Sequence, residues 1–241
     1  MDGLILAGDV GGTKTDLGLF QQSAGALTLV REHRYATAQF NSLEAVCVEF
    51  VGTGTAVNAA CLGVPGPIID GRAHATNIPW ELSSDSLSRT LKGVPVRLLN
   101  DLTAIAYGVV HLKPAEFAVL HRAENPPAHG NIAVLAAGTG LGESALVWEG
   151  DKYYAVASEG GHSDFAPRSA EQIELLKFLT GEFGHVSYER VLSGPGLWNI
   201  YRFLRRESGA EEPAWLSAQI AVGDPSAAVS GAALAGRDPV C

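Results

Sequence analysis

The first part of the chain alternates apolar runs with glycine. Residues 4–7 form a short apolar run, residues 16–20 alternate between apolar and polar side chains, and a glycine-rich stretch, residues 8–15, separates them. Because glycine permits tight turns, this pattern predicts a β-hairpin closed by the glycine-rich stretch. Residues 27–30 predict a third strand.

Strand and helix patterns then alternate, as they do in α/β folds. A short strand predicted over residues 96–99 delivers Asn100 and Asp101 at its carboxyl end, before a helix over residues 102–110. Ligands bind at this edge of open α/β sheets, which makes both side chains candidate site residues. The other elements predicted in this half are a helix over residues 43–50, capped by Ser42, and a strand over residues 59–64.

The pattern of the first hairpin returns about half a chain later. Residues 131–136 are apolar, residues 137–142 are rich in glycine, and residues 143–148 resume as a strand. Mostly helices are predicted after this point, the first of them starting at a capping box at Ser169 and ending at Gly181. The buried side of that helix is expected to consist of Ile173, Leu175, Leu176 and Leu179.

Composition excludes several classes of protein. The 241 residues include 17 Lys or Arg and 26 Asp or Glu, and the resulting net charge of −9 argues against nucleic-acid binding. With 46% hydrophobic and 18% charged residues, the chain can bury a core. The longest uncharged run, residues 50–69, is interrupted by glycine and proline, which is unsuitable for a membrane span. Three cysteines without CxxC spacing and the lack of a signal-peptide pattern predict a cytoplasmic protein without disulfides.

The two glycine-rich loops are candidate phosphate sites. Glycine lets several backbone N–H groups converge on an anion without Cβ atoms in the way. Asp9 would repel a phosphate unless a divalent cation lay between them, so its presence indicates a metal contact. Each loop alone fits an ordinary tight hairpin equally well, and neither has the Walker or dinucleotide-binding pattern. Two such hairpins together favour a polyphosphate ligand held at both ends.

Acidic side chains and one imidazole are the remaining candidates. Asp101 follows a strand, and it also suits the N-cap of the next helix. Glu159 and His162 flank two glycines, a spacing that lets both side chains converge on one small polar ligand. Glu189 falls in an expected first helical turn, where the helix dipole favours glutamate for purely structural reasons.

Six segments of the chain together resemble bacterial glucokinases. None of them is decisive alone, but all six occur in the order of that family within residues 3–206. They are Gly8-Asp9-Val10-Gly11-Gly12-Thr13, Thr76-Asn77 with Trp80, Asn100-Asp101-Leu102-Thr103-Ala104, Ala137-Gly138-Thr139-Gly140-Leu141-Gly142, Glu159-Gly160-Gly161-His162-Ser163-Asp164-Phe165-Ala166-Pro167, and Glu189-Arg190-Val191-Leu192-Ser193-Gly194-Pro195-Gly196-Leu197.

The resemblance implies a hexokinase- or actin-type α/β fold, in which two ribonuclease-H-like domains flank a cleft. It also implies transfer of the γ-phosphoryl group of ATP to the 6-hydroxyl of glucose, with Mg²⁺ as cofactor. We expect domains over residues 1–112 and 113–241, and a homodimer. Carried over residue by residue, the resemblance gives Asp101 as catalytic base; phosphate contacts at Gly8, Asp9, Val10, Gly11, Gly12, Thr13, Gly138, Thr139, Gly140 and Gly142; Mg²⁺ at Asp9 through water; and glucose contacts at Asn77, Asn100, Asp101, Glu159, His162 and Glu189.

The chain departs from related patterns in two places. The ROK sugar kinases use the histidine of a similar segment in a zinc site completed by a cysteine cluster, but here no cysteine follows His162 until Cys241, so we assign no zinc. Glucokinases also continue with a glycine-rich segment beside the adenine and a terminal helix on the first domain. Residues 224–241 predict an alanine-rich helix instead, and we therefore expect a C-terminally truncated glucokinase.

Other functions fit parts of the pattern. A kinase that uses polyphosphate or another hexose, or a non-catalytic sugar-binding remnant of the fold, would keep most of these residues. A sugar-binding regulator would need a DNA-binding module, for which the residues before Leu4 leave no room. An actin-like hydrolase would keep both loops without needing Glu159, His162 and Glu189 together. Glucose-dependent release of ADP distinguishes the kinase from these alternatives.

Overall fold

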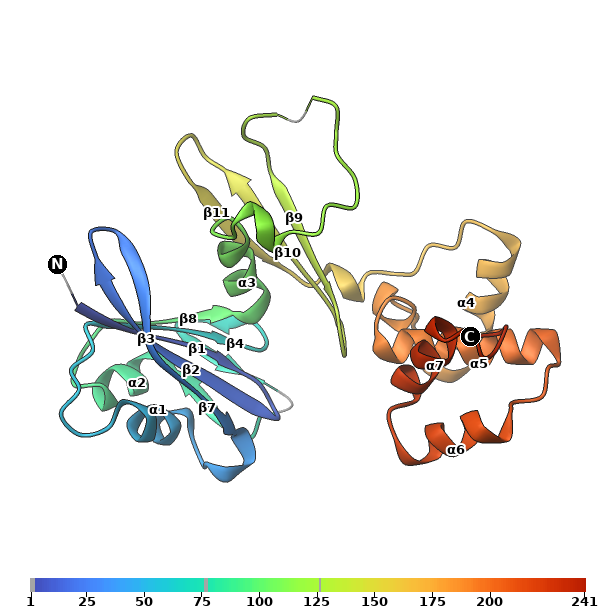
Figure 1. Cartoon of the computed structure of the whole chain (residues 1–241), viewed down its shortest axis with the longest axis horizontal. Coiled ribbons are helices and arrows are strands. Elements are labelled where there is room, and N and C mark those ends of the chain that lie inside the picture. Colours follow the sequence, from blue (N-terminus) through green and yellow to red (C-terminus); the bar gives the residue numbers. More distant parts are fainter. Residues whose placement is uncertain (1–2, 76–77, 126) are drawn as a thin grey trace. The chain divides into compact units, whose positions relative to one another are not determined.

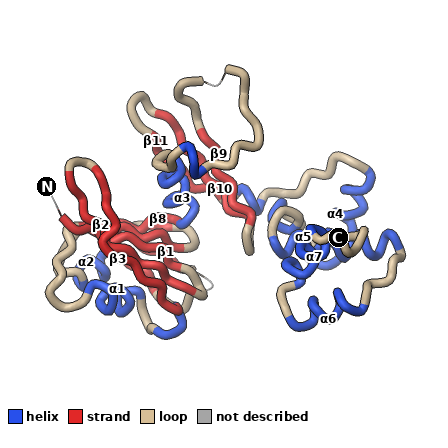
Figure 2. Tube along the Cα trace, viewed as in Figure 1, coloured by secondary structure: helices blue, strands red, loops and turns tan. Residues whose placement is uncertain are grey.

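The computed structural model describes residues 3–75, 78–125 and 127–241, and both helices and strands are present (Figure 2). The expected α/β class is therefore confirmed. The chain divides into two compact units, which are described separately. Unit 1 comprises residues 1–130 and 146–155, and unit 2 comprises residues 131–145 and 156–241.

A five-stranded mixed sheet forms the centre of unit 1. Its strand order is β3-β2-β1-β4-β8, in which β1, β2 and β3 pair antiparallel and β4 and β8 continue in parallel from β1 (Figure 1). All five strands match predicted ones, although the third is longer than the apolar run that predicted it. The strands are β1 (Gly3–Val10), β2 (Lys14–Ser23), β3 (Ala26–Ala36), β4 (Ala59–Val64) and β8 (Val96–Asn100).

Two helices pack on this sheet and bury its core. Leu6, Leu62, Val46 and Leu87 are fully buried members of this core. Ser42 caps the first helix as predicted, because its side chain accepts a hydrogen bond from Ala45 N–H. The helices are α1 (Leu43–Val51) and α2 (Ser84–Thr90); α3 (Asp101–Val109) follows β8, and a small sheet consists of β5 (Ile68–Ile69), β6 (Arg72–His74) and β7 (Glu81–Ser83).

A second sheet contains three strands in the order β11-β10-β9. Strands β9 and β10 flank the second glycine-rich loop, as predicted, whereas β11 was not predicted. The strands are β9 (Ile132–Ala137), β10 (Leu141–Trp148) and β11 (Tyr153–Ser158). Helices follow in unit 2, namely α4 (Ala170–Phe183), α5 (Gly194–Ser208), α6 (Ala214–Val222) and α7 (Pro225–Leu234), with one-turn 3₁₀ helices at Gly160–His162 and Tyr188–Arg190.

Helix α4 differs from its prediction at two positions. It continues through Gly181 to Phe183 and is capped by Gly184, which has a φ of 72°, a conformation that glycine adopts easily. The additional turn lets Phe183 pack on the core formed by Leu175 and Leu179. Ile173 was expected on the buried side but is 45% exposed.

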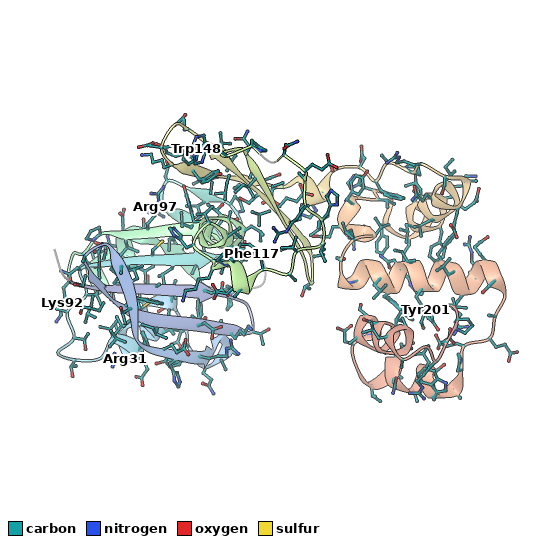
Figure 3. The ribbon with its side chains drawn as sticks, turned by 45° about the horizontal axis from the view of Figure 1, so that its top comes forward. Arg31, Lys92, Arg97, Phe117, Trp148 and Tyr201 are labelled. Carbon is teal, nitrogen blue, oxygen red and sulfur yellow. The ribbon has the colours of Figure 1, made fainter. Side chains whose placement is uncertain are left out.

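The chain ends in a buried polar cluster. The predicted helix over residues 224–241 stops at Leu234. Beyond it, the side chain of Asp238 pairs with Arg205 of α5. Arg205 also donates to the hydroxyl of Tyr201 at 2.8 Å, and this buried ring lies between α5 and the last two helices (Figure 3). Within the described ranges, no helix has the length and apolar character needed to cross a membrane.

Candidate active site

The first glycine-rich loop is closed by backbone and threonine hydrogen bonds. It joins β1 to β2, and Gly11 N–H donates to the Lys14 carbonyl at 2.8 Å. The buried hydroxyl of Thr37 donates to the Gly11 carbonyl at 2.7 Å and lies 3.0 Å from the Thr15 hydroxyl. These bonds fix the loop at the end of β1 and leave Thr13 exposed.

Parallel pairing brings three polar side chains to one edge of the first sheet. Strand β4 lies between β1 and β8, with Asp9 opposite Gly63 and Val64 opposite Asn100. Asp101 follows directly at the start of α3. The predicted position of Asn100 and Asp101 at the carboxyl end of a strand is therefore confirmed.

Asn100, and not Asp101, caps helix α3. Its Oδ1 accepts from Thr103 N–H at 3.2 Å, and its Nδ2 donates to the Gly66 carbonyl at 3.3 Å. Asp101 is the first helical residue, and its Oδ1 accepts from Leu102 N–H at 2.8 Å. The expectation that Asp101 is the N-cap is wrong by one residue, because Asn100 has the non-helical backbone (ψ 143°) that a cap requires. The Asp101 carboxylate stays half-buried at the sheet edge.

Asp9 is electrostatically suited to a cation. Desolvation raises the pKa of its carboxyl above 3.8, and the negative charges of Asp101 and Asp16 raise it further. A divalent ion near Asp9 would offset this repulsion. No group of three or more His, Cys, Asp or Glu side chains suited to a metal occurs in the described part of the chain. A hydrated Mg²⁺, which keeps several waters and binds one or two carboxylates together with phosphates, would suit a carboxylate in the environment of Asp9.

The second glycine-rich loop is tied to Glu189. It joins β9 to β10, and Gly138 N–H donates to the Gly140 carbonyl at 2.8 Å. Oε2 of Glu189 accepts from Leu141 N–H at 2.9 Å. A Cβ atom on Gly140 would lie only 2.6 Å from this oxygen. Glu189 does occupy a first helical turn, of a 3₁₀ helix, but its carboxylate contacts the loop backbone.

Glu189 also lies beside the Glu159–His162 turn. His162 Nε2 is 3.8 Å from Glu159 Oε2, and His162 Nδ1 is 4.0 Å from Glu189 Oε1. The side chains of Glu159 and His162 therefore lie close together, and Glu189 joins them. The side chains of Glu159 and His162 are 69% and 62% exposed, so they are open to a ligand. Carboxylates accept and imidazole both donates and accepts, which suits a small molecule with several hydroxyl groups.

The structure adds contacts that the sequence did not indicate. Gly160 packs against the carboxylate of Glu143, and the buried Gly161 packs against the Leu141 carbonyl. Glu143 directly follows the second loop in sequence, and only this position could have indicated that it belongs to the site. Thr37 carried no signal, because its bonds to the first loop span 26 residues.

Three predicted site residues are not seen to present a side chain to a ligand. Asn77 lies outside the described residues. Gly8 lies within β1, where a Cβ atom would come within 2.7 Å of the Leu62 side chain, so packing alone accounts for this glycine. Val10 is 2% exposed and belongs to the core, which leaves only its backbone for a ligand.

Comparison with known proteins identifies close relatives. A model of the glucokinase family matches residues 6–241. A glucokinase of Synechocystis is 38% identical over 259 residues, which cover 97% of this chain and 73% of that relative. A glucokinase of Tolumonas auensis is 41% identical over 201 residues, covering 83% of this chain and 62% of the relative.

Solved structures agree with these relatives. The crystal structure of a glucokinase from an Antarctic psychrotroph matches 99% of this chain and 73% of its own, with a TM-score of 0.81 and 30% identity. The chain thus shares the fold of that enzyme over nearly its whole length.

Proposed function

This chain belongs to the glucokinase family, and on that premise we propose roles in the reaction for the two glycine-rich loops, for Asp101 and for the cluster around Glu189. The activity of the family is phosphorylation of glucose with ATP. The observation that carries the proposal is the arrangement of acidic side chains at the carboxyl end of a sheet in unit 1 and around a histidine in unit 2.

Asp101 is the proposed catalytic base. Its carboxylate stands at the carboxyl edge of the sheet, the common ligand edge of such sheets, and the N–H of Leu102 orients one of its oxygens. In the reaction it accepts the proton of the 6-hydroxyl of glucose as that oxygen bonds to the γ-phosphorus, while the bond from this phosphorus to the bridging oxygen breaks and ADP leaves. A base of this kind contributes about 10²- to 10⁴-fold to the rate. Its neighbour Asn100 is the proposed amide contact to the sugar.

The two loops are the proposed phosphate contacts. In the first loop the backbone of residues 10–13 follows Asp9, and in the second loop residues 138–142 supply the backbone groups. Asp9 would hold Mg²⁺ through water. A bound Mg²⁺ neutralises phosphate charge, which matters because phosphoryl transfer depends mainly on positioning and electrostatics.

Glu159, His162 and Glu189 are the proposed glucose contacts. Each hydroxyl of the sugar both donates and accepts a hydrogen bond, so a displaced hydroxyl leaves a charged partner unpaired. A cluster of two carboxylates and an imidazole can therefore distinguish glucose from its epimers. Asn77 is proposed as a further contact on the resemblance alone.

We also propose that the chain consists of two ribonuclease-H-like domains, residues 1–112 and 113–241. The strand order β3-β2-β1-β4-β8, with three antiparallel strands followed by two parallel ones, supports it for the first domain. A homodimer and a cytoplasmic location remain predictions, and sedimentation analysis tests the former.

Replacement of Asp101 with asparagine tests the catalytic assignment. Asparagine keeps an oxygen for Leu102 N–H and removes the base. We expect kcat, measured as glucose-dependent ADP release, to fall at least about 100-fold. The glucose Kd, measured by calorimetry, should change less than about threefold, because the shape of the side chain is kept.

Asp85 provides a matched control. It also stands in the first turn of a helix, α2, and is not one of the proposed site residues. Asp85→Asn should keep the activity of the unaltered chain. Near-normal turnover of Asp101→Asn would reject Asp101 as base, ADP release without glucose would indicate a hydrolase, and glucose phosphorylation with polyphosphate alone would replace ATP as the donor.

A further inference from the structure

A short backbone ladder joins the two segments that carry the proposed glucose contacts. Phe165 N–H donates to the Val186 carbonyl at 2.9 Å, and Tyr188 N–H donates to the Ser163 carbonyl at 3.0 Å. Asp164 and Ser187 face each other in an antiparallel bridge between these bonds. The ladder begins directly after the Glu159–His162 turn and ends directly before Glu189.

A side-chain contact between a histidine and a carboxylate crosses the same ladder. Asp164 Oδ1 lies 2.7 Å from His185 Nε2, and the two residues are 21 positions apart in sequence. The pair thus adds a side-chain link next to the two backbone links. Gly184, with its φ of 72°, ends α4 immediately before His185, so a fixed turn sets the direction of the histidine.

We propose that Asp164 and His185 are positioning residues for glucose binding. Their pair keeps the Glu159–His162 turn and Glu189 in register, and neither side chain needs to touch the sugar itself. The inference rests on the proposed glucose contacts. It goes beyond them, because it assigns a function to a pair that has no role in phosphoryl transfer.

The exposure of the pair limits the size of the effect. The side chains of His185 and Asp164 are 61% and 89% exposed, and exposed side-chain pairs of this kind change an equilibrium by at most about fivefold. Global folding does not depend on a pair of this strength, because the helices of unit 2 have their own buried cores. The effect should therefore appear in glucose affinity and not in the unfolding temperature.

The test measures glucose Kd by calorimetry for His185→Phe, Asp164→Ala and the exchanged variant Asp164→His/His185→Asp. We expect each single variant to bind glucose about two- to fivefold more weakly. The exchanged variant restores the contact with its two groups in each other's place and should regain most of the affinity. Recovery on exchange is the readout that a general structural defect would not produce.

The pair Glu174–Lys177 on α4 is the matched control. Its separation is 2.8 Å and its side chains are 51% and 67% exposed, but it lies within one helix and does not join the two segments. Lys177→Ala should leave the glucose Kd unchanged. An equal loss in this control would overturn the proposal, because exposed pairs would then matter irrespective of position.

The variants Glu159→Gln and Glu189→Gln test the proposed glucose contacts separately from the positioning role of Asp164 and His185. If both keep the glucose Kd of the unaltered chain, or if that chain does not bind glucose, the proposed contacts are wrong and this inference is wrong with them. If both weaken binding while His185→Phe and Asp164→Ala do not, the contacts stand and the positioning role is rejected. Weakened single variants without recovery in the exchanged variant also reject it.

Discussion

Replacing Gly140 with alanine would place a methyl group against the carboxylate of Glu189. The new Cβ would lie 2.6 Å from Oε2, whereas ordinary van der Waals contact begins at 3.4 Å. The carboxylate must therefore move by about 0.8 Å, the difference between the two distances. Oε2 also accepts the hydrogen bond from Leu141 N–H, so the substitution affects this bond directly.

The size of the effect follows from that hydrogen bond. Its length is 2.9 Å, and a displacement of 0.8 Å away from the loop lengthens it to 3.7 Å, too long for a hydrogen bond. A hydrogen bond to a charged group contributes about 1.5–3 kcal/mol. If Glu189 contacts glucose from this position, losing the position should weaken glucose binding about 10- to 100-fold.

Calorimetry with glucose, together with urea unfolding of the same samples, measures both consequences. Gly181→Ala is the control, because Gly181 is exposed within helix α4 and has open space around its Cα. Alanine there should raise the free energy of unfolding by about 0.8–1.0 kcal/mol and leave the glucose Kd unchanged. A Gly140→Ala chain that remains folded and binds glucose within twofold of the unaltered chain would contradict the expected loss. Glu189 would then either move without loss or not contact the sugar.

Three further substitutions give distinct results. Asp9→Asn removes a carboxyl whose pKa is raised, so it should increase the free energy of unfolding at pH 7 and lose this gain below pH 3.8, as urea denaturation at pH 7 and below pH 3.8 would show. The same substitution should weaken ATP binding, measured by titration. Asp238→Ala leaves Arg205 without its buried partner and should lower the free energy of unfolding by about 3–5 kcal/mol, measured in urea. Thr37→Val removes the hydroxyl bound to Gly11 and should raise the KM for ATP while the glucose Kd stays constant.

Local patterns predicted those parts of the site that depend on neighbours in sequence. The apolar run before the first loop and the strand before Asn100 are short segments whose own composition defines them. Strand β3 shows the limit of such patterns. The apolar side chains that predicted it are Leu27, Leu29 and Val30. The charged residues after them still form a strand because their backbone pairs with β2, with one register shift at Leu19 and Phe20.

Contacts between distant residues left little or no local signal. The bond from Leu141 to Glu189 spans 48 residues, and the pair of Asp164 with His185 spans 21. The end of α4 was mispredicted for a related reason. Gly181 and Gly184 both suit a helix end, and only the packing of Phe183 on Leu175 and Leu179 favours the later one.

Several glycines of the site lie where residues distant in sequence come close, but the sequence does not show which residues these are. None of the site glycines at positions 8, 140, 160 and 161 is among the described residues with positive φ, so a left-handed backbone does not explain them. Each instead faces a group that would collide with a Cβ atom: the Leu62 side chain, the Glu189 carboxylate, the Glu143 carboxylate and the Leu141 carbonyl, respectively. Three of the four partners belong to the second loop, its following strand or the Glu189 turn. The glycine-rich motifs therefore mark where the backbone of the site is closely packed, and a methyl group at any of these positions tests that packing directly.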